Sequence, residues 1–241
     1  MNIPINIPFE ANTVYLVGAG SGDPKYLTLE AYSILLQAEI ILYDTNLKSL
    51  CDLFPQAISE TVGKRKGFHE KKQNEINDLL VEYAKQGKRV VRLKGGDVSF
   101  FARASEEISI LQENGFKVKL VMGISSPQLL AGALGESLTH RDLTRSISFY
   151  SGYRDKSIPR VDLPNTDAHI IFMGLGDLEE IVVMLLNSGK SPETSFIAAS
   201  NLGRTNQRIL KTTLGNAIEE VKAANLESPT LLAIGLGHII E

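Results

Sequence analysis

The sequence has little of what disulfide-bonded or membrane proteins need. Its 241 residues contain one cysteine, Cys51, which allows no internal disulfide and fits a reducing compartment. Its longest apolar runs are far below the ~20 residues that span a bilayer. No charged-then-apolar leader is visible at the N-terminus. We therefore expect a cytoplasmic protein without a membrane partner.

Other features that the sequence lacks argue against several classes of function. The net charge of −3 gives no reason to expect affinity for nucleic acid. His69 and His140 have no partners at metal-ligand spacing and no cysteine cluster exists, so we expect no metal site. No Gly-x-Ser-x-Gly motif supports a serine hydrolase. A hydrophobic content of 43% with 22% charged residues is typical of a soluble globular protein.

What the chain does contain is an alternation of apolar strands and amphipathic helices. After a loose arm over residues 1–12, we expect an N-terminal α/β domain over 13–121 and a C-terminal α/β domain over 122–241. Strands are expected over 13–17, 40–43, 88–93, 117–121, 146–150, 168–173, 194–199 and 230–234. One helix begins at Thr28, and others cover 73–85, 105–113, 128–135, 178–187 and 213–224. This alternation predicts mostly parallel sheets.

The stretch Arg92-Leu93-Lys94-Gly95-Gly96-Asp97 closes the strand over 88–93. Open α/β sheets bind ligands at the carboxyl ends of their strands. The two glycines permit positive φ or close approach of the backbone to a ligand, and the aspartate offers a carboxylate. Taken alone, the pattern is more typical of a strand-to-helix turn than of a binding site.

A second glycine-rich turn, Gly18 to Pro24, invites a dinucleotide interpretation. Its spacing is Gly-x-Gly-x-Gly, and Asp23 stands where the dinucleotide fingerprint needs its third glycine. An aspartate there would repel a pyrophosphate, and Pro24 falls where the helix should start. Asp44, after the second strand, sits about where a ribose-binding acid is expected. A nicotinamide-dependent dehydrogenase therefore stays open as an alternative, beside a plain tight turn.

Basic residues gather in the loop that holds Lys64 and Arg65 and at the His140-Arg141 pair, with Arg103 and Arg145 as further candidates. Solvated surface charge is the usual explanation of such a run. The functional interpretation is a set of cations that binds a polycarboxylate.

Taken in their order along the chain, these motifs and several further segments resemble those of the tetrapyrrole methylase family. The ordered set is far more specific than any single motif, and it covers nearly the whole chain after residue 12. The matching segments are Val17 to Pro24, Leu42 to Asp44, Val62 to Arg65, Gln73 with Glu75 to Asn77, Val91 to Asp97, Leu138 to Arg141, Phe172 to Gly174 and Gln207-Arg208.

The resemblance implies a homodimer of two-domain α/β chains that binds S-adenosyl-L-methionine in the cleft between the domains and releases S-adenosyl-L-homocysteine. The implied substrate is uroporphyrinogen III, methylated at C2 and C7 to precorrin-2 for sirohaem or cobalamin. Asp44 takes the place of the proton acceptor and Lys64 that of the proton donor. The implied cofactor positions are Ser21, Gly95, Gly96, Asp97, Phe100, Ser125, Ser126, Met173, Leu202 and Thr230. For the substrate we assign Arg65, Arg103, Thr139, His140, Arg141 and Arg145.

Several positions depart from the family pattern. A proline usually follows the aspartate where Val98 and Ser99 stand here, Ala102 to Glu107 replaces Gly-Arg-Gly-Gly-Glu-Glu, and Leu202-Gly203 replaces Gly-Thr. Most changes keep small or apolar character. Another precorrin methyltransferase, or a translation-factor or ribosomal-RNA methyltransferase, stays open within the same fold. A non-catalytic cofactor-binding module is a further alternative, and Asp44 with Lys64 argues against it.

Overall fold

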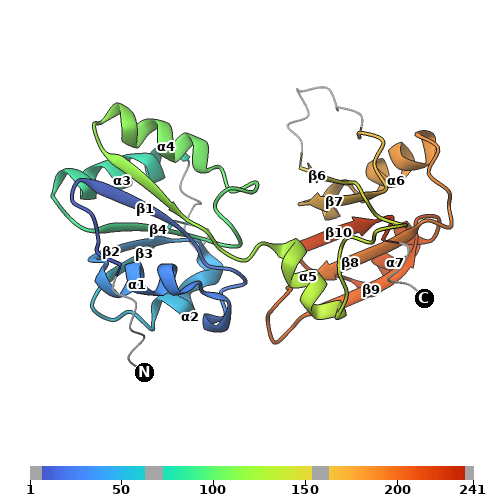
Figure 1. Cartoon of the computed structure of the whole chain (residues 1–241), viewed down its shortest axis with the longest axis horizontal. Coiled ribbons are helices and arrows are strands. Elements are labelled where there is room, and N and C mark those ends of the chain that lie inside the picture. The colour runs from blue at the N-terminus through green and yellow to red at the C-terminus, as the bar shows by residue number, and fades with distance from the viewer. Residues whose placement is uncertain (1–6, 63–72, 154–162, 237–241) are drawn as a thin grey trace. The chain divides into compact units, whose positions relative to one another are not determined.

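One five-stranded sheet forms the centre of each half of the chain (Figure 1). The computed structural model describes residues 7–62, 73–153 and 163–236. The chain forms two compact units, Met1–Ser125 and Ser126–Glu241. None of the helices in the described ranges combines the length and the hydropathy of a membrane span.

The N-terminal sheet is parallel throughout. Its strand order is β3-β2-β4-β1-β5. The strand β3 was missed in the sequence because it is a short edge strand whose side chains are largely exposed, so it has no apolar run. The strands are β1 (Thr13–Gly18), β2 (Ile40–Tyr43), β3 (Ile58–Thr61), β4 (Val90–Lys94) and β5 (Lys117–Val121).

Helices cover both faces of this sheet (Figure 1). Successive side chains of a strand point to opposite faces, so Tyr15 and Val17 of β1 enter one core while Val14 and Leu16 enter the other. The doubly buried strands therefore read as continuous apolar runs, which is why the sequence revealed them. Helices α1 (Leu29–Gln37) and α2 (Lys48–Cys51) pack on the first core, and α3 (Gln73–Lys85) and α4 (Ala104–Glu113) on the second.

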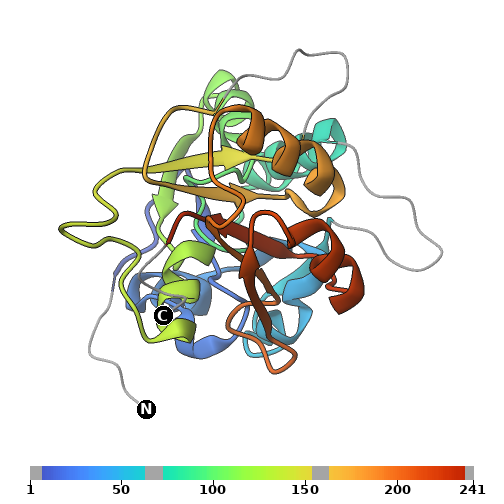
Figure 2. The same cartoon turned by 90° about the vertical axis from the view of Figure 1, so that its right-hand side faces the viewer.

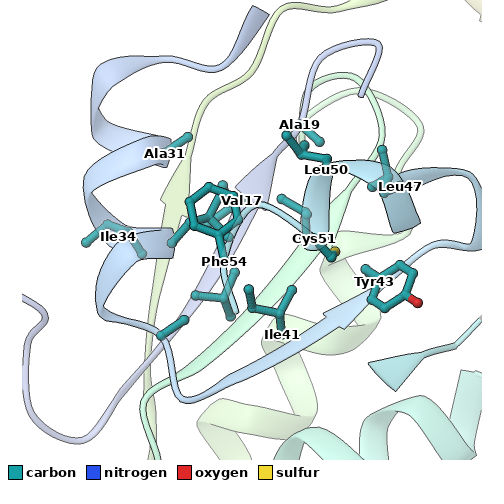
Figure 3. Close-up of a cluster of buried hydrophobic side chains, with 14 of the residues drawn as sticks. Val17, Ala19, Ala31, Ile34, Ile41, Tyr43, Leu47, Leu50, Cys51 and Phe54 are labelled. Atoms are coloured by element: carbon teal, nitrogen blue, oxygen red, sulfur yellow. The ribbon is translucent and has the colours of Figure 1, made fainter. Parts of the chain in front are cut away.

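The first core encloses the single cysteine. Figure 3 shows Cys51 among apolar side chains, with Phe54 and Ile34 packed near Val17. Burial raises the pKa of the Cys51 thiol to about 12, so this side chain is a neutral core residue. We expected residues 1–12 to form a loose arm. In the part of this segment that the structure describes, Ile7 and Phe9 pack against the same core.

The C-terminal sheet has the strand order β6-β7-β10-β8-β9. Only the β6–β7 pair is parallel among the pairs of these strands, and β10 is antiparallel to both of its neighbours. Figure 2 shows the helices α6 and α7 side by side, and both pack on one face of this sheet. The strands are β6 (Ile147–Ser151), β7 (Ala168–Phe172), β8 (Ser195–Ser200), β9 (Arg208–Thr213) and β10 (Thr230–Ile234). The helices are α5 (Ser126–Leu134), α6 (Leu178–Asn187) and α7 (Ala217–Ala224).

The predicted class of two α/β domains is confirmed, but mostly parallel pairing holds only for the N-terminal sheet. The helix α6 does connect strands of equal direction, β7 and β8, and α7 does the same for β9 and β10. A strand of opposite direction lies between the two members of each pair. The strand β9 accounts for the difference, because the sequence pattern did not predict a strand there. Without it, a simple β-α-β succession was the natural expectation.

Candidate active site

The N-terminal sheet has a switch point between β1 and β4. The connections that follow these two parallel strands run toward opposite sides of the sheet. The connection after β1 passes through α1 to β2, and the connection after β4 passes through α4 to β5. The two helices lie on opposite faces of the sheet. Such a point leaves a crevice outside the carboxyl ends of the strands, where open α/β sheets bind ligands. Both glycine-rich turns that the sequence singled out begin at this point.

Three turns contact one another there through their backbones. The N–H of Gly20 donates to the carbonyl of Gly96 (3.1 Å), and the N–H of Gly96 donates to the carbonyl of Gly20 (2.7 Å). A Cβ at Gly123, after β5, would lie 2.3 Å from the Gly96 carbonyl oxygen, and a Cβ at Gly18 would lie 2.7 Å from Gly123 Cα. Only glycine fits at Gly18 and Gly123, because any side chain would push the turns apart.

Asp97 fastens two of these turns together. It is buried, its Oδ2 accepts from the N–H of Gly123 (2.8 Å), and its Oδ1 accepts from the N–H (2.8 Å) and the hydroxyl of Ser99. Both carboxylate oxygens of this predicted cofactor residue are thus engaged within the protein. Asp97 therefore shapes the turn that presents Gly95 and Gly96.

Gly95 and Gly96 face open space. A Cβ built on either residue would meet no atom within 4 Å, and Gly96 has a φ of +71°. Their backbone is therefore accessible to a ligand laid against it, which fits S-adenosyl-L-methionine as the resemblance implies. Ser21 lies on the neighbouring turn after β1, where its Oγ accepts from the N–H of Asp23 (3.2 Å).

The turn after β1 does not have the geometry of a dinucleotide site. The glycines lead into the short 3₁₀ helix η1 (Pro24–Tyr26), which Asp23 caps by accepting from the N–H of Lys25 (3.1 Å). The helix α1 begins only at Leu29, so no α-helix N-terminus stands directly behind the glycines to hold a pyrophosphate. The dehydrogenase alternative therefore loses its structural basis.

Asp44 follows β2 at the same edge of the sheet. Its Oδ1 accepts from Nη2 of Arg92 (2.7 Å), and its Oδ2 accepts a longer hydrogen bond from the N–H of Gly95 (3.4 Å). The side chain of Asp44 is 39% exposed, whereas that of Arg92 is buried. A buried guanidinium thus holds one carboxylate oxygen, and the other oxygen faces the open glycine turn.

A buried group of charges, which the sequence pattern did not predict, lies beneath this turn. Arg92 and Lys94 of β4 point to the face that α4 covers, where Glu107 is fully buried. Nε of Arg92 donates to Glu107 Oε1 (3.0 Å), and Nζ of Lys94 lies 2.8 Å from both Glu107 oxygens. The available signal was the presence of two cations in an otherwise apolar strand, because buried charges need partners.

The titration of the two cations reflects their burial. Burial lowers the pKa of Arg92, but the carboxylates of Asp44 and Glu107 outweigh burial, so the net shift is upward. Burial, followed by the charge of Arg92, lowers the pKa of Lys94 despite the opposing effect of Glu107. Arg92 is therefore the firmly charged member of the pair.

The loop between β4 and α4 carries two further predicted residues. Phe100 is exposed and lies edge-on to Phe101, with 6.4 Å between the ring centroids. Arg103 forms a two-pronged ion pair with Glu106, at 2.9 Å for each bond. Phe101 and Arg103 have positive φ angles (51° and 52°), a strained conformation that is common at functional sites.

In the C-terminal unit, three predicted cofactor residues gather at one edge of the sheet. Met173 follows β7, Leu202 lies just after β8, and Thr230 begins β10. Because β10 runs opposite to its neighbours, its amino end lies beside their carboxyl ends, with Thr230 in register with Ser200. Met173 is exposed and has a φ of +55°, whereas Leu202 and Thr230 are buried.

The remaining predicted residues lie elsewhere. Ser125 is a buried residue at the end of the N-terminal unit, and Ser126 begins α5. Thr139, His140 and Arg141 are exposed, and the His140–Thr144 bridge closes a short loop directly after Thr139. Arg145 precedes β6, and its N–H donates to Asp167 (2.9 Å) just before β7, at the opposite edge of the sheet from Met173. Lys64 and Arg65 lie outside the described residues.

Comparison with known proteins defines the class. Residues 13–218 match the family model described as Tetrapyrrole (Corrin/Porphyrin) Methylases, and the chain belongs to this family. The resemblance that the motifs predicted is therefore confirmed.

Individual relatives carry more specific names. The uroporphyrinogen-III C-methyltransferase of Methanocaldococcus jannaschii is 38% identical over 229 residues, which cover 92% of this chain and 95% of that protein. The siroheme synthase of Psychrobacter arcticus is 38% identical over 92% of this chain, but the matched part is only 42% of its own length. The crystal structure of uroporphyrin-III C-methyl transferase from Thermus thermophilus, complexed with S-adenyl homocysteine, has a TM-score of 0.78 and 32% identity, covering 95% of this chain and 100% of that one.

Proposed function

We propose that this chain transfers two methyl groups from S-adenosyl-L-methionine to uroporphyrinogen III, at C2 and C7, giving precorrin-2 for sirohaem or cobalamin. Relatives named for this reaction match the chain over nearly its whole length. The observation in the structure that carries the proposal is the position of Asp44. Its Oδ2 faces the open Gly95-Gly96 turn at the switch point, while Arg92 holds Oδ1.

The chain's own residues have simple tasks in this reaction. S-adenosyl-L-methionine supplies an electrophilic methyl group on its sulfonium, so the protein needs chiefly to position the reactants. The backbone of Gly95 and Gly96 gives the cofactor its surface, and Ser21, Phe100, Ser125 and Ser126 complete the positions assigned in this part of the chain. Met173, Leu202 and Thr230 are the positions assigned in the C-terminal unit.

A proton must leave the macrocycle once a ring carbon has gained a methyl group. We assign its acceptance to Asp44, at the oxygen that Arg92 leaves free, because a carboxylate placed there acts as a general base. Lys64 is the proposed proton donor. Arg65, Arg103, Thr139, His140, Arg141 and Arg145 are the proposed partners of the substrate's carboxylate arms, since charge-assisted hydrogen bonds select such groups.

We propose further that the chain works as a homodimer in the cytoplasm, as its family resemblance implies. Size-exclusion chromatography with light scattering tests the assembly. A monomer at working concentration would contradict it.

Anaerobic incubation of the purified chain with uroporphyrinogen III and S-adenosyl-L-methionine tests the reaction. We expect mass spectrometry to show a product with one added methyl group, followed by a product with two. Calorimetry with S-adenosyl-L-homocysteine runs in parallel. If the cofactor product binds but no methylated tetrapyrrole forms, the substrate assignment is wrong and other reduced tetrapyrroles become the next candidates.

A further inference from the structure

Glu107 is the centre of the buried charges beneath the glycine turn. It lies in the first turns of α4 and is 0% exposed. Its oxygens accept from Nζ of Lys94 (2.8 Å to each), from Nε of Arg92 (3.0 Å) and from Nε2 of Gln73 (3.4 Å). A carboxylate so completely enclosed does not touch substrate or cofactor, and its effect on chemistry must pass through a neighbour.

That neighbour is Arg92, whose guanidinium is held on three sides. Its Nε donates to Glu107, its Nη1 donates to the carbonyls of Leu93 (3.1 Å) and Leu42 (3.4 Å), and its Nη2 donates to Asp44 Oδ1 (2.7 Å). Only one nitrogen is therefore directed at Asp44, and Arg92 engages only one of the two Asp44 oxygens. The other oxygen, Oδ2, accepts a long hydrogen bond from the N–H of Gly95 (3.4 Å). An arginine and a carboxylate left to themselves tend toward a two-pronged pair that uses both oxygens.

We propose that Glu107 is a positioning residue for the methyl-transfer reaction: by holding Nε of Arg92, it restricts the guanidinium to one oxygen of Asp44 and keeps the other oxygen clear of the arginine, so that this oxygen can accept the substrate proton. This inference rests on the proposed function, because it gives Asp44 the role of base. It assigns to Lys94 a different task, the balancing of charge. Arg92 and Lys94 together neutralise Asp44 and Glu107.

Two double variants separate positioning from charge. Lys94→Met with Glu107→Met removes the buried pair and every acceptor for Nε of Arg92 at position 107. Lys94→Met with Glu107→Gln has the same net charge but keeps a carbonyl oxygen that accepts from Nε. Replacing a buried ion pair by apolar residues of similar volume is often tolerated by the fold. Thermal melting and calorimetry with S-adenosyl-L-homocysteine establish that each variant is folded.

We expect the methionine pair to lower kcat about tenfold or more, the order of effect of a displaced general base, with KM for S-adenosyl-L-methionine changed by less than about twofold. The methionine–glutamine pair should recover kcat to within about threefold of the wild type. The control is Glu113→Gln, an exposed carboxylate in the last turn of the same helix, which should leave both constants unchanged. Equal kcat in the two double variants, whether high or low, overturns the proposal.

A crystal structure of the methionine pair gives a readout that does not need turnover. The guanidinium of Arg92 is expected to engage both oxygens of Asp44, and an unchanged single contact overturns the proposal. This readout also separates the two claims. If the wild type fails to methylate uroporphyrinogen III, the proposed function falls, and the Arg92 geometry in the variant still decides the role of Glu107. If the methionine pair does not fold, leucine at both positions takes its place in both experiments.

Discussion

In the N-terminal unit, the turns at the edge that holds the candidate site follow β1, β2, β4 and β5, which all run in one direction. In the C-terminal unit, the corresponding edge combines the carboxyl ends of β7 and β8 with the amino end of β10. The first arrangement places glycine backbones and a carboxylate beside one another. The second places single residues of different strands in a row. Both sheets have five strands, but the N-terminal sheet brings its loop residues together with parallel strands and the C-terminal sheet does so with antiparallel neighbours.

The buried polar side chains differ in the same way. Within the described ranges, the buried charged groups of the N-terminal unit are Arg92, Lys94, Asp97 and Glu107. The buried polar side chains of the C-terminal unit are all neutral at pH 7 in the same ranges. They are Thr144, His169, Ser195, Ser200, Asn201, Thr212 and Thr230. Within the described ranges, the buried charges are therefore confined to the unit that contains Asp44. The predictions below test that division, from the largest expected effect to the smallest.

The largest effect is expected for Asp44→Asn. Loss of the general base should lower kcat by about 10²–10⁴-fold. The affinity for S-adenosyl-L-homocysteine should stay near the wild-type value, because Arg92 keeps its bond to Glu107 and the turn keeps its shape. Anaerobic turnover and calorimetry measure the two quantities. Asp52→Asn, an exposed carboxylate paired with Lys48, is the matched control. Turnover near the wild-type rate in Asp44→Asn would remove this residue from the mechanism.

Gly123→Ala should damage both the fold and the site of the N-terminal unit. The new Cβ would lie 2.3 Å from the Gly96 carbonyl oxygen, so the turns must separate at a cost of about 3 kcal/mol. Urea denaturation measures this loss, and calorimetry should show weaker cofactor binding. Gly95→Ala is the contrasting variant, because its Cβ meets no atom within 4 Å. It should weaken binding with little change in stability. Equal stability of the two variants would contradict the close contact of the turns.

The C-terminal unit should show a pH-dependent stability that His169 controls. The side chain is 1% exposed, its Nδ1 is 2.7 Å from Ser148 Oγ, and Nε2 has no hydrogen-bond partner among the described residues. Burial, with a smaller effect of Lys190, lowers its pKa from 6.5 to about 4. The unfolded chain therefore binds the proton first. The stabilising contribution is complete above pH 6.5 and falls by about 1.4 kcal/mol per pH unit as the pH drops toward 4.

Urea denaturation of wild type and His169→Gln at pH 7 and pH 5 measures this contribution. The wild type should lose more stability than the variant over that interval. Equal losses of stability in the wild type and the variant would show that burial does not lower the pKa of His169.

The smallest effect is expected for Gly132→Ala in the helix α5. A Cβ there meets no atom within 4 Å, and alanine favours the helix over glycine by about 0.5–1 kcal/mol. The melting temperature should rise slightly while kcat stays unchanged. Gly135→Ala, just beyond the same helix, should act in the opposite direction because Gly135 has a φ of +71°. A loss of turnover in Gly132→Ala would challenge the division between the units.

The sequence predicted the elements with strong apolar patterns. The helices over 73–85 and 178–187 and the inner strands of the N-terminal sheet were found where the structure has them. The strands β3 and β9 were missed, and each lies at the edge of its sheet. An edge strand is covered on fewer sides, so it needs fewer apolar side chains and leaves a weaker pattern.

Part of the candidate site was predictable from the positions of its residues relative to the strands. Glycine turns and Asp44 stand at strand ends, and parallel strands bring such ends to one edge, so their proximity could be inferred. The pairing of Arg92 and Lys94 with Glu107 could not, because it depends on how α4 packs across the sheet. The contact of Gly96 with Gly20 and Gly123 depends likewise on the three-dimensional arrangement of the turns.

The contact of three glycine turns has a consequence for how the N-terminal unit acquires its ligand. Gly18 and Gly123 stand near opposite ends of the unit's sequence, and contacts between such distant residues carry a large loop-closure entropy. A partly folded chain that still lacks β5 therefore has no complete floor for the crevice. A ligand that binds there selects the fully assembled sheet and stabilises it by mass action. Cofactor supply during refolding should thus raise the yield of the native unit and leave the early steps of folding unaltered.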